Sequence, residues 1–154
     1  MANQGRLAIL QHGVASWNAW RNEHPTIRPD LSRCSLVGAD LMRVDLRGAV
    51  LFQVDLRGAI LEEADLSEAD MAGANLSLAN LRRTNLSRVM LVRADLIGAI
   101  LRAATLEDTD LQYADLYNAD LRGAHLSGVD MSQADLSGAD LTRIDLSHAE
   151  RGSA

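Results

Sequence analysis

Leucine recurs at every fifth residue from Leu31 to Leu146, and only Met71 and Met131 interrupt these 24 positions. If the leucine is called position i, position i−2 is alanine in 15 of the 24 repeats. Position i−1 is aspartate or asparagine in 17 of them. A fixed internal period of this kind is the signature of a repeat architecture, so the backbone has to be one that suits a period of five.

An α-helix does not suit this period. Five helical residues turn through roughly 500°, which would spread the leucines around the whole helix and leave no apolar face. In an extended segment, i−2 and i point to one side and i−1 to the other. Because five is odd, a straight strand would turn the next leucine to the opposite face. The chain therefore has to bend once per repeat, at i+1 and i+2, where glycine recurs from Gly38 to Gly138.

A chain that bends regularly and always buries the same side coils around a narrow core. We expect alanine and leucine to point inward, and each buried leucine to contribute on the order of 1.5–3 kcal/mol, an upper estimate. We expect the aspartates at i−1 to point outward and to accept hydrogen bonds from backbone N–H groups at the bend. Cys34 occupies an i−2 position and is predicted to fill the core rather than to act as a nucleophile.

The motif of alanine, aspartate or asparagine, leucine and two variable residues resembles that of the pentapeptide-repeat family. Typical stretches read ADLMRVDLRG and ADLYNADLRGAHLSG. Members of that family form right-handed quadrilateral β-helices in which four repeats make one coil. The resemblance implies an all-β solenoid over residues 29–150, of about six coils that each rise ~4.8 Å along the axis.

Residues 1–28 differ from the repeats. Leu7, Leu10, Val14 and Trp17 lie at spacings of three and four, which predicts one short amphipathic helix ended by Pro25. We interpret residues 1–28 as a capping helix with its connector; a docking helix is the alternative. The stretch ILQHGVASWNAWRNEHPTIRPDL resembles a leader that often precedes such repeats in bacterial, especially cyanobacterial, proteins. Residues 151–154 form a short tail.

Composition narrows the functional classes. The formal net charge of −6 disfavours direct binding to nucleic acid or to an anionic membrane. The single cysteine allows no intramolecular disulfide, and no apolar run approaches the ~20 residues of a membrane span. A cytoplasmic location is therefore expected. The four histidines have no metal-ligand spacing, and no phosphate loop or dinucleotide fingerprint is present. We predict no catalytic site, no cofactor and no metal.

Two sets of outward residues remain as candidates for function. Positions i+1 and i+2 hold eleven arginines against five acidic residues. Either neighbouring aspartates neutralise these arginines or an anionic partner does. The candidate basic stripe comprises Arg43, Arg82, Arg83, Arg102, Arg122 and Arg143. Apolar residues at outward positions form the candidate interaction surface, although scattered apolar residues are also normal on surfaces. That set comprises Phe52, Met90, Val92, Ile97, Ile100, Tyr113 and Tyr117.

The sequence favours a non-catalytic protein-interaction scaffold whose partner it does not identify. The alternative, which the family resemblance suggests, is a DNA mimic that binds DNA gyrase and confers quinolone resistance. Such proteins look like longer, strongly acidic rods, whereas this chain places arginine at its variable positions. Only four residues follow the repeats, too few for a second cap. We therefore expect the C-terminal coil to pair with that of a second copy, as a homodimer.

Overall fold

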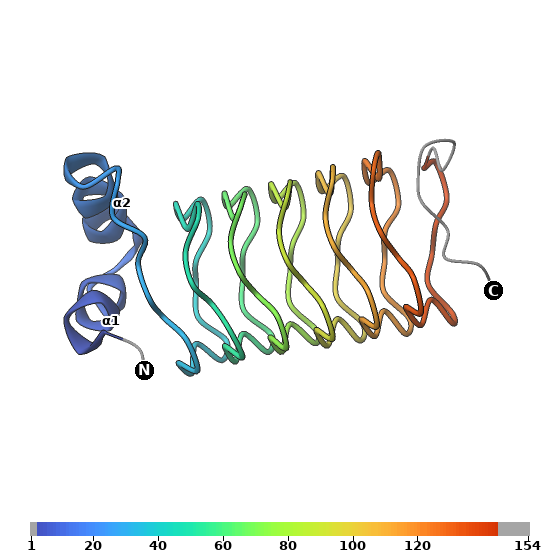
Figure 1. Cartoon of the computed structure of the whole chain (residues 1–154), viewed down its shortest axis with the longest axis horizontal. Helices are drawn as coiled ribbons and strands as arrows, with labels where there is room; N and C mark the ends of the chain where they lie inside the picture. The colour runs from blue at the N-terminus through green and yellow to red at the C-terminus, as the bar shows by residue number, and fades with distance from the viewer. Residues whose placement is uncertain (1–2, 145–154) are drawn as a thin grey trace.

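The computed structural model is a rod with two N-terminal helices at one end and regular coils behind them (Figure 1). The structure describes residues 3–144. Helix α1 spans Gln4–Gln11 and helix α2 spans Val14–Glu23. Neither described helix has the length and the run of apolar residues that a membrane crossing requires.

Every coil takes 20 residues, so four repeats complete one turn. Each residue at i−1 forms an isolated parallel bridge with the residue 20 positions later, from Asp30 with Val50 to Asp120 with Asp140. Two kinds of hydrogen bond flank the first bridge: Leu31 N–H donates to Val50 O, and Val50 N–H donates to Pro29 O, both at 2.8 Å. Because only one residue per side pairs in this way, the sides are bridges rather than longer strands. The predicted coil of four repeats is confirmed.

The four sides are named here by their leucine columns. The first face contains Leu31 and the residues 20, 40, 60, 80 and 100 positions later, and the second, third and fourth faces contain Leu36, Leu41 and Leu46 with their equivalents. Coil 1 begins at Leu31, and each later coil begins 20 residues further on. The second and fourth faces are opposite sides of the rod, as are the first and third.

The bend at every corner has one defined conformation. All 23 residues at i+2, from Arg33 to Arg143, have a φ between 53° and 71°, and 15 of them are not glycine. From Leu31 to Leu136, the backbone N–H three residues after the residue at i closes a turn, as Ala39 N–H does by donating to Leu36 O at 3.1 Å. A positive φ at the third turn residue is the feature of type II turns. The variable sequence at position i+2 suggests that this position is unconstrained. The positive φ shows instead that its backbone conformation is constrained.

The core is a stack of leucines along the axis. From Leu46 to Leu126 every residue at i is at most 1% exposed, including Met71. The i−2 residues are buried beside them, and Cys34 is buried as predicted. Burial raises the pKa of the Cys34 thiol, so this thiol is a poor nucleophile. Where threonine replaces alanine at i−2, its hydroxyl finds a partner: Thr84 Oγ1 donates to Leu61 O at 2.7 Å.

The N-terminal segment caps the first coil, but with two helices where the sequence predicts one. The break lies at Gly13, whose φ of 115° no helix accommodates. Trp17 of α2 is fully buried, and its Nε1–H donates to Asp45 O at 2.7 Å. Asn18 accepts from Asp45 N–H at 2.9 Å and donates to Arg43 O at 3.0 Å. At Asp45, helix α2 thus supplies the two hydrogen bonds that a preceding coil would supply.

At the other end the described core residues are less covered. Met131, Leu136, Leu141 and Ile144 are partly exposed, whereas their equivalents in earlier coils are buried. The predicted tail at residues 151–154 and the end of the last coil, on which the expected homodimer depends, lie outside the described residues.

Candidate functional site: the outward faces of the rod

The aspartates at i−1 serve the bend. Each of the 16 aspartates and asparagines at i−1 among residues 3–144 accepts a hydrogen bond through its Oδ1 from the backbone N–H two residues later, as Asp95 does from Ile97 at 3.0 Å. Serine at i+1 adds a second bond: Ser67 Oγ donates to Asp65 Oδ1 at 2.7 Å. The predicted local role of the aspartates is confirmed, so their number alone does not indicate a ligand site.

The arginines of the candidate basic stripe all lie on the third face, where acidic residues alternate with them. Glu63 lies 2.8 Å from Arg43 Nε and 3.5 Å from Arg83 Nη1. The hydrogen bond and positive charge of Arg43 lower the pKa of Glu63, so this carboxylate is firmly ionised. Arg82, Arg102 and Arg122 also have acidic neighbours, so five of the six stripe residues are paired before any partner binds.

The middle of the third face carries the other pairs. Asp120 accepts hydrogen bonds from Arg102 Nε and, at 2.8 Å, from Arg122 Nη2. Arg122 also lies 3.5 Å from Asp140, and Arg82 lies 3.8 Å from Glu62. The arginine column that sequence spacing predicts is present, with its charge balanced inside the face. Arg143 is exposed at the end of this column.

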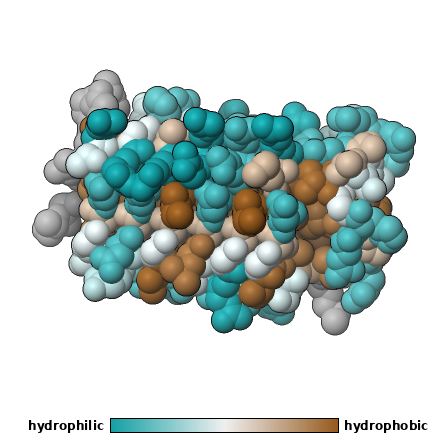
Figure 2. Space-filling model, turned by 180° about the vertical axis from the view of Figure 1, so that it is seen from behind, coloured by the Kyte–Doolittle hydropathy of each residue, from teal (hydrophilic) through white to brown (hydrophobic). Residues whose placement is uncertain are grey.

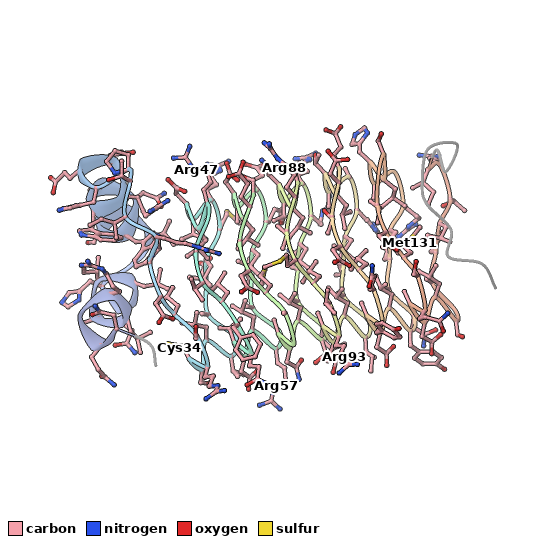
Figure 3. The ribbon with its side chains drawn as sticks, in the orientation of Figure 1. Cys34, Arg47, Arg57, Arg88, Arg93 and Met131 are labelled. Atoms are coloured by element: carbon pink, nitrogen blue, oxygen red, sulfur yellow. The ribbon has the colours of Figure 1, made fainter. Side chains whose placement is uncertain are left out.

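The candidate interaction surface is divided between two regions. Phe52, Met90, Val92 and Tyr113 lie on the first face, where an arginine contacts each of the two rings while Met90 and Tyr113 remain exposed. The guanidinium of Arg33 lies 5.7 Å from the centre of the Phe52 ring, and Arg93 lies 5.5 Å from the centre of Tyr113. These aromatic side chains therefore have partners within the rod. Arginines project from opposite edges of the rod, as the labelled Arg47 and Arg57 show (Figure 3).

The second region is the corner between the second and third faces. Ile97 of coil 4 and Tyr117 of coil 5 lie at this corner in one column, and Ile100 follows the corner in coil 4. Leu78 of coil 3 completes the group, because its Cδ2 lies directly over Gly98. All four side chains are exposed, and Leu78 is 71% exposed. We name Leu78, Ile97, Ile100 and Tyr117 the corner patch. Apolar side chains also form separate patches among hydrophilic ones in the view of Figure 2.

Sequence reasoning missed Leu78, although it is the most unusual residue of the patch. Its φ is 59°, in the left-handed region that bulky side chains avoid. It is the only aliphatic residue larger than alanine among the 23 positive-φ positions of the described coils. Its exposure also leaves its apolar area in water. The signal was available, since a leucine at i+2 stands where the other repeats place glycine, arginine or another polar residue in most cases.

Carboxylates without a cationic partner adjoin the corner patch. Asp95 and Asp115 precede Ile97 and Tyr117 on the second face, and Asp135 follows in coil 6. Within residues 3–144, none of the three forms an ion pair. In coil 2 of the same face, by contrast, Asp55 Oδ2 lies 2.7 Å from Arg57. The unpaired negative charge of the second face is thus confined to the coils beside the patch.

A hollow of about 790 Å³ lies where the cap meets the fourth face, and it is lined by polar groups. Arg21, nearly buried there, donates to Ile27 O at 2.7 Å and to Arg47 O at 2.8 Å. Arg28 Nε donates to Gly48 O at 2.7 Å. These contacts tie the connector to coil 1, which accounts for the arginines of the hollow.

Other candidates for chemistry do not converge. His125 is exposed on the fourth face, and His12 contacts Ala8 O within its own segment, while His148 lies outside the described residues. No three histidine, cysteine, aspartate or glutamate side chains from residues 3–144 gather as metal ligands would. The described histidines thus offer no shared site.

Comparison with known proteins agrees with this geometry. The family profile described as Pentapeptide repeats matches in eight copies, over residues 30–51, 49–88, 91–128 and 114–150. No curated protein is similar enough to the chain to count as a relative.

Among solved structures, the chain is similar to the pentapeptide repeat protein Rfr23 from the cyanobacterium Cyanothece 51142. The two are 35% identical with a TM-score of 0.58, over 83% of this chain and 93% of that one. It is also similar to a pentapeptide repeat protein of the Arabidopsis thaliana thylakoid lumen, at 31% identity and a TM-score of 0.51, over 65% of this chain and 66% of that one.

QnrB1, a plasmid-mediated fluoroquinolone resistance protein, is 22% identical with a TM-score of 0.38, over 77% of this chain and 66% of that one. The repeat, the 20-residue coil, the family profile and the likeness to Rfr23 lead to one assignment. The chain is a right-handed quadrilateral β-helix with an N-terminal helical cap, and it belongs to the pentapeptide-repeat family.

Proposed function

We propose that the protein is a non-catalytic scaffold that binds a partner protein through the corner patch. The observation that carries this proposal is Leu78, which combines two unfavourable features in one side chain. It is largely exposed to water, and its backbone is in the left-handed region. The positive φ is common to all i+2 positions of the described coils, so what distinguishes Leu78 is that a bulky apolar side chain both takes this conformation and is exposed. Exposed apolar groups of neighbouring residues mark contact surfaces.

Affinity capture with the full-length protein tests the proposal. We expect wild-type protein to retain at least one protein from a lysate of its source that Leu78→Asn/Tyr117→Ser does not retain. Asparagine accepts a positive φ readily, so the variant keeps the fold. The control is Val37→Ser/Met42→Gln, which removes two exposed apolar side chains in coil 1. If every retained protein is also retained by the corner variant, the patch is not the binding surface.

DNA mimicry receives no support from the distribution of charge. A continuous negative stripe along the rod would favour it, yet each i−1 column is interrupted. The first face has Val50 and Met90, the third has Ile60 and Ile100, the second has Asn75, and the fourth has Thr105. We expect no inhibition of DNA gyrase supercoiling by stoichiometric protein; clear inhibition would favour the mimic. The cytoplasmic location and the homodimer through the C-terminal coil stay predictions.

A further inference from the structure

The corner patch has a regular spacing along the rod. Leu78, Ile97 and Tyr117 belong to three successive coils, so they advance by ~4.8 Å per coil and span ~10 Å. Leu78 N–H donates to Ile97 O, and Gly98 N–H donates to Tyr117 O, both at 2.9 Å, which fixes this register. Residues i, i+3 or i+4, and i+7 of an α-helix advance by ~4.5–6 Å and ~10.5 Å. Side chains on one face of an extended strand would advance by ~6.8 Å per pair of residues. The spacing of the patch therefore matches a helix better than a strand.

The negative charge beside the patch favours a partner segment with positive charge. Asp95 and Asp115 present carboxylates that no arginine among residues 3–144 pairs with. The arginines of the third face in coils 4 and 5, Arg102 and Arg122, are already held by Asp120, and Arg57 of the second face is held by Asp55. Among residues 3–144 of a second copy, nine arginines already have a carboxylate neighbour, and Arg6, Arg33 and Arg93 lie over aromatic rings. The better complement to these carboxylates is therefore a different chain with unpaired basic residues.

We infer that the corner patch and the carboxylates of Asp95 and Asp115 together dock a basic amphipathic helix of a partner protein. The inference rests on the proposed scaffold function and adds the chemistry of the partner. The apolar stripe of such a helix lies along Leu78, Ile97 and Tyr117, and its lysines or arginines face the second face. Helices of this kind are read through apolar anchors three to four residues apart.

A synthetic probe tests the inference without knowledge of the partner. The probe is a peptide of about 18 residues, with leucine on one helical face and lysine on the other, long enough to span the patch. Two matched peptides replace lysine by glutamate or place proline at the centre. We expect the leucine–lysine peptide to bind wild-type protein and the other two to bind at least about tenfold more weakly.

Variants of the protein locate the binding surface. Asp95→Asn/Asp115→Asn keeps the backbone acceptor at each bend, because asparagine already fills this role at Asn75. The control, Glu107→Gln/Asp108→Asn, removes the same charge from the opposite face in coil 4. We expect the first pair to weaken peptide binding about tenfold and the control less than about twofold. Leu78→Asn/Tyr117→Ser is expected to weaken it about tenfold or more.

The outcomes separate this inference from the proposed function. Equal loss in both charge variants would mean general attraction to an acidic protein, and equal binding of the glutamate peptide would remove the role of charge; either result overturns the inference. If lysate capture depends on the patch while the leucine–lysine peptide does not bind, the scaffold function stands and the basic helix is wrong. A free protein that sediments as a dimer, and as a monomer after Leu78→Asn/Tyr117→Ser, would show that a second copy covers the patch.

Discussion

The second and third faces have the same backbone conformation and share one leucine core, but their charged side chains are arranged differently. On the third face, acidic residues of neighbouring coils hold the arginines, as Glu63 holds Arg43. On the second face, Asp95 and Asp115 have no such neighbour among the described residues, and apolar side chains adjoin them. The repeat therefore dictates what points inward and how the chain bends, whereas the outward residues decide what each face can bind.

The largest effect on stability is expected in the leucine core, where the second and third faces do not differ. Leu96 on the second face and Leu101 on the third are both fully buried. We expect Leu96→Asp and Leu101→Asp each to prevent folding, because an unpaired charge in an apolar core costs many kcal/mol. Leu96→Met, which keeps the volume, should cost less than about 1.5 kcal/mol. Circular dichroism and chemical denaturation measure both. A folded aspartate variant would show that the inward assignment is wrong for that face.

A smaller effect concerns the strain that the second face carries. Leu78→Asn is expected to raise the free energy of unfolding by about 0.5–1.5 kcal/mol, since asparagine tolerates the left-handed region better than leucine. Asn118, two coils further along the same column, has a φ of 56° and supplies the reverse control. Asn118→Leu should lower the free energy of unfolding by a similar amount. Urea denaturation measures the two changes; equal signs would contradict the account of strain.

Removal of one carboxylate from each face should affect stability differently. Asp120→Asn breaks the contacts with Arg102 and Arg122 but keeps the acceptor for the bend. Because these pairs are partly exposed, we expect a loss of about 0.5–1 kcal/mol that shrinks with added salt. Asp115→Asn has no ion pair to break within the described chain and should cost close to nothing. A larger loss for Asp115→Asn would reverse the comparison.

The smallest effect lies in the acid titration of the two faces. Hydrogen bonds from Ser137 lower the pKa of Asp135 on the second face, whereas Arg43 lowers that of Glu63 on the third. A lowered folded pKa stabilises the protein above the unfolded pKa, and this contribution disappears as pH falls through the folded pKa, below about pH 4. In ~1 M salt, NMR titration should move the pKa of Glu63 upward and leave that of Asp135 in place. Equal shifts would mean that both depend on ion pairing.

Much of the fold follows from the sequence because every repeat has the same pattern of inward and outward residues. The period of five required a bend, put Leu86 inside, and gave aspartates such as Asp65 their hydrogen bonds at the corner. Two structural features could not be predicted from the sequence. Nothing in the spacing of Leu10 and Val14 shows that Gly13 divides the cap into two helices. The variable residues at i+2 look unconstrained, although every described one has a positive φ.

The candidate site was predictable only in part. Spacing placed Arg82, Arg102 and Arg122 in one column and offered neighbouring aspartates as their partners, which Asp120 is, but it did not show that Glu62 takes this role for Arg82. The apolar set was divided because the contacts of Arg33 and Arg93 with the two rings depend on how long side chains fold back across a coil. Leu78 belongs to the patch because its side chain lies over Gly98 of the next coil, a contact that residue type alone does not predict.

Binding is expected at one corner of an otherwise uniform rod. Chemical-shift mapping of the isotope-labelled protein with the leucine–lysine peptide tests it directly. We expect the largest shifts at Leu78, Ile97, Ile100 and Tyr117 and at the amides beside Asp95 and Asp115, with the fourth face unchanged. Shifts spread over the acidic residues of every face, or centred on α1 and α2, would contradict the claim.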